Sequence, residues 1–269
     1  MAIGTIHDFE THLKSRGLSE HSIQAFTLDI RQFLEFAGDR DISSSLISDW
    51  FSHLHEKGLT NKTLSRKRTA LSIYSKWLGQ SWELPKIKPE KRLPDALSEV
   101  EAKAVLEAAG QTRHANRNRL MVELMLRCGL RASELLSLKA EDFQEDGGIL
   151  YIHVVLGKGK KDRRIPVTYK PLQQAIKKYT KGMLPSDILF PMIDRNLRKL
   201  VADIGRKAGL SKRLHPHMLR HTAATLYLRK GANIESVRRT LGHESLATTQ
   251  KYLALTDEDV AKDLARATW

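Results

Sequence analysis

The sequence contains a single cysteine, Cys128, among 269 residues. One thiol can form neither an intrachain disulfide nor a cluster of thiolate metal ligands. Cys128 lies in an apolar run typical of a buried helix, so we expect a small core residue rather than a reactive thiol. The cysteine content therefore excludes disulfide-stabilised and thiolate-metal proteins.

Long hydrophobic runs are also missing. No apolar stretch reaches the roughly 18 residues that a membrane-spanning helix needs, and no signal-peptide pattern opens the chain. Neither an internal repeat of solenoid length nor a low-complexity segment is present. We therefore expect a globular cytoplasmic protein without a membrane partner.

Acidic residues do not balance the basic ones. The 45 Lys and Arg residues outnumber 31 Asp and Glu residues, which gives a net charge of +14 and a pI near 9.8. Residues 1–85 carry ten of each sign, so the whole surplus lies in residues 86–269. A basic surplus of this size predicts a polyanionic partner.

The first third of the chain has the apolar spacing of four short amphipathic helices, with Ser19 and Thr60 as N-caps of the second and the fourth. Four cations lie off the apolar face of the fourth helix: Lys62, Arg66, Lys67 and Arg68. In a domain of zero net charge this cluster favours a DNA-facing side. Ordinary solvated surface is the alternative.

A proline cluster separates this helical part from the rest. Three prolines fall within ten residues: Pro85, Pro89 and Pro94. They favour an extended connector over 85–95, and Lys86 and Lys88 add basic charge to it. The length of the chain favours two domains, which we place at 1–84 and 96–269.

The second domain is predicted to be mostly helical with a small sheet. A capping box, Ser98 with Glu101, opens its first helix. The period-two run ILYIHVVL, the turn GKGKKDR and the run RIPV predict a β-hairpin with a cationic tip. Further helices are expected at 171–181 and 193–208, and a short amphipathic tail helix at 257–269.

The stretch 215–252 concentrates residues suited to phosphate chemistry. His217 and Arg220 fall three positions apart, so a helix would present both on one face. His243 and Tyr252 follow. Guanidinium groups bind phosphate oxygens bidentately, which favours phosphate over carbonyl or redox chemistry. The alternative is a basic helix that binds the DNA backbone and whose histidines only pack within the protein.

Four blocks of the sequence, in order, resemble the signature motifs of tyrosine recombinases, the phage-integrase family. The blocks are GLRASELLSL, GKGKKDRRIPV, HPHMLRHTAATL and LGHESLATTQKY. SIQAFTLDIRQFLEF and LSRKRTALSIYSKWL are similar to the family's core-binding domain. The chain looks most like the Xer recombinases of bacteria and archaea. The resemblance implies a mainly α protein: a helical, SAM-like core-binding domain and a mixed α+β catalytic domain with a small antiparallel sheet.

The resemblance also carries over six catalytic positions, each onto a matching residue. These are Arg131, Lys158, His217, Arg220, His243 and Tyr252. It implies that the tyrosine attacks a DNA phosphodiester to give a 3′-phosphotyrosine and a 5′-hydroxyl, without cofactor, metal or ATP. His215 and His221 have no catalytic counterpart in the family and are interpreted as structural. Glu134, Glu141 and Asp142 show no nuclease-like spacing and are interpreted as solvated or capping charges.

The partners implied are a double-stranded DNA recombination site and further protomers. The family acts as a tetramer with two protomers active at a time, so we expect a homotetramer or a heterotetramer with a paralogue, associated with the nucleoid. The tail 257–269 is expected to dock on a neighbouring catalytic domain. Resolution of chromosome or plasmid dimers is preferred to integration of a mobile element. Type IB topoisomerase-like relaxation and a catalytically silent DNA-binding role are the rival functions.

Overall fold

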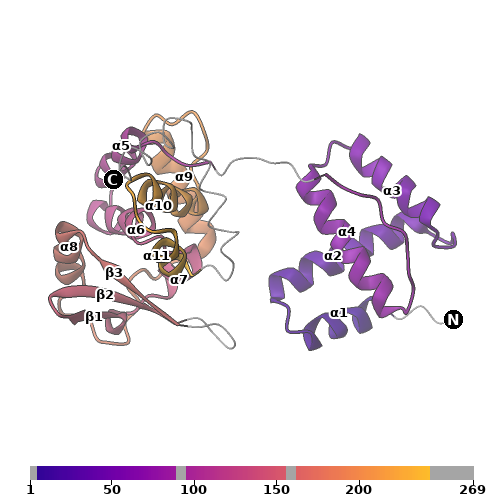
Figure 1. The fold of residues 1–269 in the computed structure, drawn as a ribbon, viewed down its shortest axis with the longest axis horizontal. Coiled ribbons are helices and arrows are strands. Elements are labelled where there is room, and N and C mark those ends of the chain that lie inside the picture. The colour runs from indigo at the N-terminus through magenta and orange to yellow at the C-terminus, as the bar shows by residue number, and fades with distance from the viewer. Residues whose placement is uncertain (1–4, 89–94, 156–161, 243–269) are drawn as a thin grey trace, which may run out of the picture. The chain divides into compact units, whose positions relative to one another are not determined.

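The computed structural model describes residues 5–88, 95–155 and 162–242. The chain divides into two compact units, residues 1–91 (unit 1) and 92–269 (unit 2) (Figure 1). Each unit has its own hydrophobic core. The fold is mainly helical with one small antiparallel sheet, as the sequence predicted.

Over residues 5–88, unit 1 forms the four predicted helices. They are α1 (Ile6–Ser15), α2 (Glu20–Ala37), α3 (Ser44–Glu56) and α4 (Asn61–Trp77). Each begins after a hydroxyl side chain that accepts a hydrogen bond from the first turn: Thr5, Ser19, Ser43 and Thr60. Aromatic rings fill much of the core. Phe9 contacts Tyr74, and Phe33 contacts Trp50, both edge to face.

The polar interior of unit 1 corrects one expectation about α4. Lys67, predicted to face solvent, is only 3% exposed. Its ammonium group donates to the buried carboxylate of Asp29 at 2.9 Å and also bonds Gln32. Because an unpaired charge is costly in a protein interior, Lys67 can be buried here only because Asp29 neutralises it, and Asp29 also pairs with Arg66. The helix period alone did not reveal the pair, since Asp29 lies on α2.

Unit 2 holds seven further α-helices within the described chain, one 3-10 turn and three strands. In chain order they are α5 (Glu99–Gly110), α6 (Ala115–Arg127), α7 (Ala132–Ser137), η1 (Ala140–Asp142), β1 (Phe143–Asp146), β2 (Ile149–Val154), β3 (Arg163–Val167), α8 (Lys170–Thr180), α9 (Asp194–Lys207), α10 (Pro216–Arg229) and α11 (Ile234–Leu241). The strand order is β1-β2-β3, with both pairs antiparallel.

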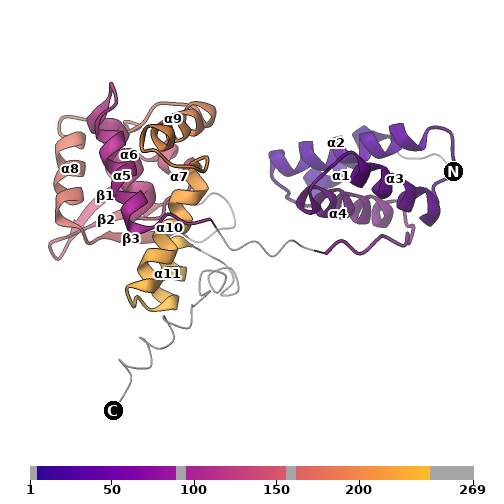
Figure 2. The ribbon, with the colours of Figure 1, turned by 90° about the horizontal axis from the view of Figure 1, so that it is seen from above.

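Helix α6 is the central element of unit 2, and α5, α7, α8 and α10 pack against it (Figures 1 and 2). Its residues from Leu120 to Leu126 are buried on nearly all sides, as expected for an interior helix. Cys128 follows it and is buried, as predicted; burial raises the pKa of its thiol to about 12. No described helix has the length and apolar character needed to cross a membrane.

The predicted hairpin is formed by β2 and β3, in which Ile152 lies opposite Ile165. Apolar side chains alternate inward along both strands, so one face of the sheet joins the core. The connection between the strands includes Lys158 and lies outside the described residues. Strand β1 was not predicted, because its sequence FQED carries only one apolar residue.

Candidate active site

The candidate site begins where the chain leaves α6. Gly129 adopts φ +65°, and a Cβ at this position would lie 2.4 Å from Cδ2 of Leu241. Glycine is therefore required both by the left-handed backbone and by the close approach of α11. This turn leads to Arg131, which is the N-cap residue of α7.

Arg131 is held by a carboxylate on its own helix. Glu134 lies three residues later and accepts hydrogen bonds from the Arg131 amide at 2.8 Å and from its guanidinium at 2.6 Å. The Arg131 side chain is still 38% exposed. Both terminal nitrogens of its guanidinium are therefore held, by Glu134 and by the carbonyl of Gly242, in a side chain that is still partly exposed.

Arg220 reaches the same place from α10. Its side chain is 2% exposed, and its guanidinium donates to the carbonyl of Gly129 at 2.6 Å and to that of Leu241. One guanidinium nitrogen lies 3.9 Å from Oε2 of Glu134. The structure thus brings the two predicted catalytic arginines, Arg131 and Arg220, together around one carboxylate.

Of the two interpretations of Glu134, a capping charge is confirmed and a solvated charge is wrong, because the residue is buried. It does complete the capping arrangement of α7, but it is only 6% exposed and also binds Arg163 of β3. That contact is bidentate, with distances of 2.9 and 2.8 Å. Burial alone would raise the pKa of Glu134, but hydrogen bonds and charge from Arg163, with hydrogen bonds from Arg131, outweigh it and lower the pKa to about 2.

The C-terminal end of α11 completes the cluster. Its last carbonyls each accept a hydrogen bond from a different guanidinium: Thr240 from Arg163 at 2.8 Å, Leu241 from Arg220, and Gly242 from Arg131 at 3.1 Å. Such carbonyls lack helical partners and carry partial negative charge, so cations stabilise them. We call Glu134, the three arginines and these carbonyls the arginine site.

The histidines of α10 differ in position. His217 is exposed, three residues before Arg220 and on the same helix. Its ring lies 4.1 Å, centroid to centroid, from that of His221 in an edge-to-face arrangement. His215 is the N-cap residue, and its Nδ1 accepts a hydrogen bond from the Met218 amide at 3.1 Å. The capping contact supports the structural role predicted for His215.

Half of the predicted catalytic set can be placed in this way. Arg131, His217 and Arg220 lie in the described part of unit 2, whereas Lys158, His243 and Tyr252 lie outside it, as does the tail 257–269. In the sequence, His243 directly follows Gly242, whose carbonyl accepts from Arg131.

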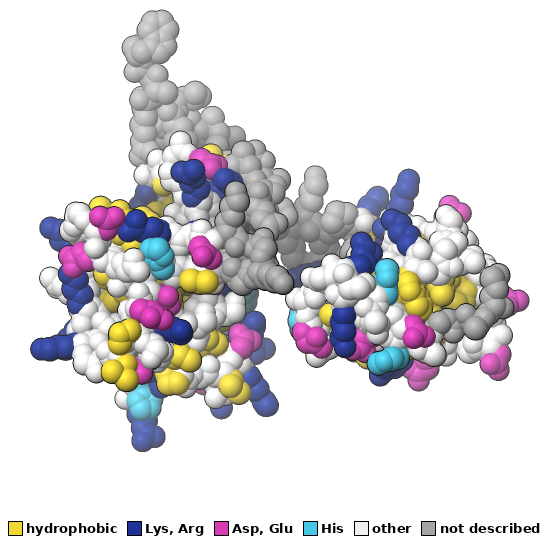
Figure 3. Space-filling view, turned by 90° about the horizontal axis from the view of Figure 1, so that it is seen from below, with side chains coloured by type: hydrophobic (Ala, Val, Ile, Leu, Met, Phe, Trp, Pro, Cys, Tyr) yellow, Lys and Arg dark blue, Asp and Glu magenta, His cyan; other side chains and the backbone are white. Residues whose placement is uncertain are grey.

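The predicted DNA-contacting cations of unit 1 fall into two groups. The side chains of Lys62, Lys86 and Lys88 are exposed. Those of Arg66, Lys67 and Arg68 are engaged: Arg66 and Lys67 pair with Asp29, and Arg68 donates to the carbonyl of Pro85 at 2.8 Å. Figure 3 shows Lys and Arg side chains projecting from both units, interspersed with acidic ones, on the face drawn.

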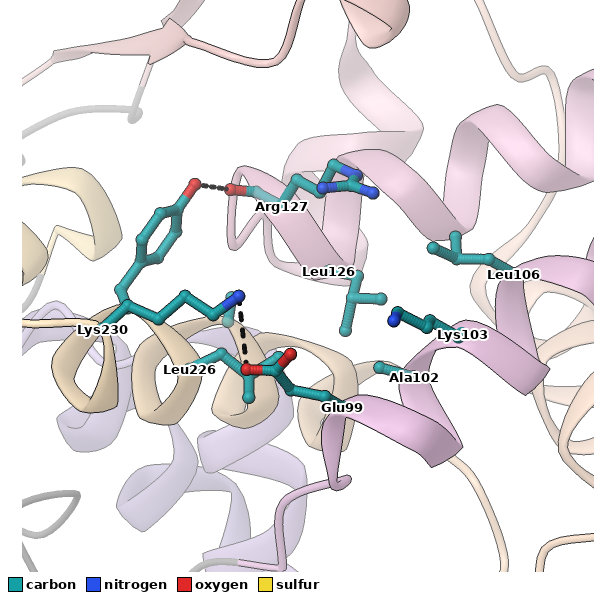
Figure 4. Close-up of a pocket in the computed structure, with 10 residues that line it drawn as sticks. Glu99, Ala102, Lys103, Leu106, Leu126, Arg127, Leu226 and Lys230 are labelled. Atoms are coloured by element: carbon teal, nitrogen blue, oxygen red, sulfur yellow. Dashed lines mark hydrogen bonds and ion pairs between the residues drawn. The ribbon is translucent and has the colours of Figure 1, made fainter. Parts of the chain in front are cut away.

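A separate pocket lies between α5, α6 and α10 of unit 2 (Figure 4). Its apolar lining includes Leu106, Leu126 and Leu226, and its cations are Lys103, Arg127 and Lys230. The ammonium group of Lys230 lies 3.2 Å from the carboxylate of Glu99. The pocket contains no residue of the arginine site.

Comparison with known proteins identifies the family of the chain. Residues 95–259 match the model of the phage integrase family, and residues 6–81 match that of the phage integrase N-terminal SAM-like domain. The chain is 35% identical to the tyrosine recombinase XerA of Thermococcus kodakarensis, over 97% of this chain and 94% of that protein. The chain therefore belongs to the phage integrase family, the tyrosine recombinases, as predicted.

Two solved structures are similar over nearly the whole chain. A crystal structure of XerA recombinase shares 28% identity, covers 98% of each chain and has a TM-score of 0.56. The XerH site-specific recombinase bound to its difH substrate in a pre-cleavage complex shares 24% identity, covers 97% of this chain and 84% of that one, and has a TM-score of 0.76.

Proposed function

We propose that this chain is an Xer-type site-specific recombinase that cuts and rejoins double-stranded DNA through a covalent bond between DNA and Tyr252. The observation that supports this most strongly is the arginine site. Arg131 and Arg220 come from different elements and meet at one buried carboxylate. Two guanidiniums held side by side suit the non-bridging oxygens of a phosphodiester.

In the proposed reaction the phenolic oxygen of Tyr252 attacks the scissile phosphorus. A bond forms between that oxygen and phosphorus, and the bond from phosphorus to the 5′-oxygen breaks. His217 accepts the phenol proton, which is needed because a tyrosine has a pKa of about 10. Lys158 donates a proton to the departing 5′-oxygen. The products are a 3′-phosphotyrosine and a 5′-hydroxyl.

The arginine site stabilises the charge that develops in this step. Arg131 and Arg220 donate to the non-bridging oxygens, and His243 donates a further hydrogen bond to one of them. Each preorganised donor of this kind contributes about 3–4 kcal/mol to transition-state stabilisation. Attack by a different 5′-hydroxyl then reverses the chemistry and releases Tyr252. The phosphodiester energy is retained in the phosphotyrosine, so neither ATP nor a metal is required.

The proposed substrate is a duplex recombination site. Strand exchange proceeds through a Holliday junction in a tetramer with two protomers active at a time, formed by this chain alone or with a paralogue. The name of the relative XerA and the DNA-bound structure of XerH support a DNA recombination site as the substrate. Resolution of chromosome or plasmid dimers is the preferred role, and the exposed side chains of Lys62, Lys86 and Lys88 are proposed to contact the DNA backbone.

The tail 257–269 is proposed to dock on a neighbouring protomer and to couple the active sites. The pocket between α5, α6 and α10 is the proposed acceptor. Its leucines match the apolar side chains of the tail, and its cations match the acidic ones, which are Asp257, Glu258, Asp259 and Asp263. Deletion of 257–269 should spare DNA binding and reduce recombination. Unchanged recombination would contradict the docking.

A nicked suicide duplex tests the proposed chemistry. Such a substrate loses a short strand after cleavage, which traps the covalent complex. The wild-type chain should give a band of lower mobility on a denaturing gel, and Tyr252→Phe should give none. Equal results for both proteins would favour a silent DNA-binding role. Relaxation of any supercoiled plasmid without synapsis would favour a topoisomerase instead.

A further inference from the structure

We infer that Arg163, at the start of β3, is a positioning residue for the proposed reaction. Its contacts fix Glu134, which orients Arg131, and also fix the end of α11, which leads directly to His243. This inference rests on the proposed function, because it assigns Arg163 a role in organising that same site.

The contacts of Arg163 use both sides of its guanidinium. The two terminal nitrogens bind the two oxygens of Glu134 at 2.9 and 2.8 Å, and Nε donates to the carbonyl of Thr240 at 2.8 Å. The side chain is only 8% exposed. A planar fork that is bound along both edges and shielded from water has little freedom to turn.

The carboxylate links Arg163 to the first predicted catalytic arginine. Oε1 of Glu134 accepts from Arg163 at 2.9 Å and from Arg131 at 2.6 Å. Without Arg163, that carboxylate would lose a bidentate partner in a buried place and would be free to rotate. Arg131 would then lose the fixed acceptor that sets its orientation, although its own atoms would be unchanged.

The same side chain also restrains the end of α11. A Cβ on Gly242 would lie 3.1 Å from both Cδ and Nη1 of Arg163, so the guanidinium packs directly over the glycine. Arg163 follows Lys158 by five positions in the sequence, and Gly242 immediately precedes His243. The Arg163 side chain therefore connects β3, which follows Lys158 in the sequence, with the end of α11, which precedes His243.

The chain provides a matched control in the next residue. Arg164 lies on the opposite face of β3, where it pairs with exposed Asp146 at 3.1 Å and stacks over the Tyr151 ring at 4.3 Å. Arg164→Ala removes the same charge and a side chain of the same size from the same strand. It leaves every contact of the arginine site in place.

The first test measures single-turnover formation of the covalent complex at saturating suicide duplex. We expect Arg163→Ala to lower the rate by about 10- to 100-fold, since small misplacements of reacting groups have effects of this size. Arg163→Lys should recover part of the lost rate. The Kd of Arg163→Ala for DNA should differ from that of wild type by less than about threefold. Arg164→Ala should react at the wild-type rate. Equal rates for Arg163→Ala and wild type would overturn the inference.

A double-mutant cycle separates positioning from general destabilisation. If Arg163 acts through Glu134, the double variant Arg163→Ala with Glu134→Gln should react about as slowly as the slower single variant. Multiplicative losses would overturn the inference. If circular dichroism shows that Arg163→Ala is unfolded, Arg163→Lys and Arg163→Gln replace it in the cycle.

Hydrogen–deuterium exchange gives a readout that does not depend on the reaction. In Arg163→Ala the amides of residues 234–242 should exchange at least several-fold faster than in wild type and in Arg164→Ala, because the helix end loses its restraint. Unchanged exchange would overturn the inference. Failure of wild type to form a covalent complex on any duplex would instead defeat the proposed function, while the exchange result would still report whether Arg163 restrains α11.

Discussion

Glu134 is the residue that converts three separate cations into one site. Its carboxylate is buried, which would be costly for an isolated charge. The bidentate contact with Arg163 and the two hydrogen bonds from Arg131 compensate for that cost. The energetic result is a carboxylate that stays ionised to low pH, with a pKa of about 2 instead of the ordinary 4.5.

A pH series on Glu134→Gln tests this result. A carboxyl group whose pKa is lowered by folding stabilises the protein above its unfolded pKa, and the contribution is lost as pH falls through the folded value. A shift from 4.5 to about 2 corresponds to about 3 kcal/mol. The stability advantage of wild type over Glu134→Gln should therefore shrink by about 3 kcal/mol between pH 5 and pH 2.

The measurement is urea unfolding of both proteins at pH values across that window, followed by a signal from unit 2. Stability curves that stay parallel from pH 5 to pH 2 would show that folding does not perturb Glu134. If the stability advantage of wild type over Glu134→Gln grew as pH falls, it would have the wrong sign for a carboxylate held by guanidiniums.

At this scale the sequence predicted part of the site. The family motifs identified Arg131, His217 and Arg220, and two of these meet in the structure. The capping role of Glu134 was predicted, but its burial against Arg163 was not, and Arg163 itself was missed. Both depend on contacts between residues 29 and 77 positions apart. Arg163 lies within the motif GKGKKDRRIPV, but the neighbouring Arg164 looks equally suitable, so the motif alone could not single it out.

At the scale of elements, the junction of α6, α7 and α11 determines whether the arginine site can form. Gly129 permits the turn, and its carbonyl accepts from Arg220 at 2.6 Å. We expect Gly129→Ala to lower the free energy of unfolding by about 2–3 kcal/mol, because it adds backbone strain and displaces Leu241. Cleavage of a suicide duplex should slow as well.

Gly148→Ala is the control for that change. Gly148 also has a positive φ, +76°, but nothing lies within 4 Å of the added Cβ. In Gly148→Ala the free energy of unfolding should fall by only about 1 kcal/mol, because of backbone strain, and the cleavage rate should be unchanged. Equal destabilisation in the two variants, measured by thermal unfolding, would mean that the approach of α11 to Gly129 contributes nothing.

Helix α4 of unit 1 provides a second test at this scale. Lys67 is bound to Asp29 and Gln32 in the interior, and Arg66 would still pair with Asp29 without it, so Lys67→Met should cost about 2 kcal/mol of stability. Lys62 is exposed on the same helix, so Lys62→Ala should leave stability unchanged and weaken DNA binding. In a plot of log affinity against log salt, Lys62→Ala should lower the slope by about one.

The comparison uses salt titrations of DNA affinity and urea unfolding for both variants. A stability loss for Lys62→Ala that equals that of Lys67→Met would contradict the division of these cations into a structural and a surface group. An unchanged salt slope for Lys62→Ala would contradict its proposed contact with DNA.

Most helices could be predicted because capping residues and apolar periodicity are local signals. Strand β1 could not be predicted from periodicity, since it is polar and is stabilised by pairing with β2. The signal that was overlooked is Gly147-Gly148, which allows a two-residue turn between Asp146 and Ile149. Lys67 was misplaced because its partner Asp29 is supplied by another helix.

At the scale of the whole molecule, the two compact units differ in net charge. Unit 1 has no net charge over residues 1–85, whereas the rest of the chain carries the entire surplus of +14. We therefore expect unit 2 and the connector to supply most of the electrostatic attraction to DNA. Unit 1 adds a limited set of exposed cations.

In the proposed reaction Tyr252 becomes covalently joined to DNA next to the arginine site. The most direct measurement is to trap the complex on a suicide duplex, digest the protein and identify the DNA-bearing peptide by mass spectrometry. We expect a peptide containing Tyr252 attached to the 3′-phosphate end of the cleaved strand. Attachment through another residue, or to a 5′-phosphate end, would contradict it.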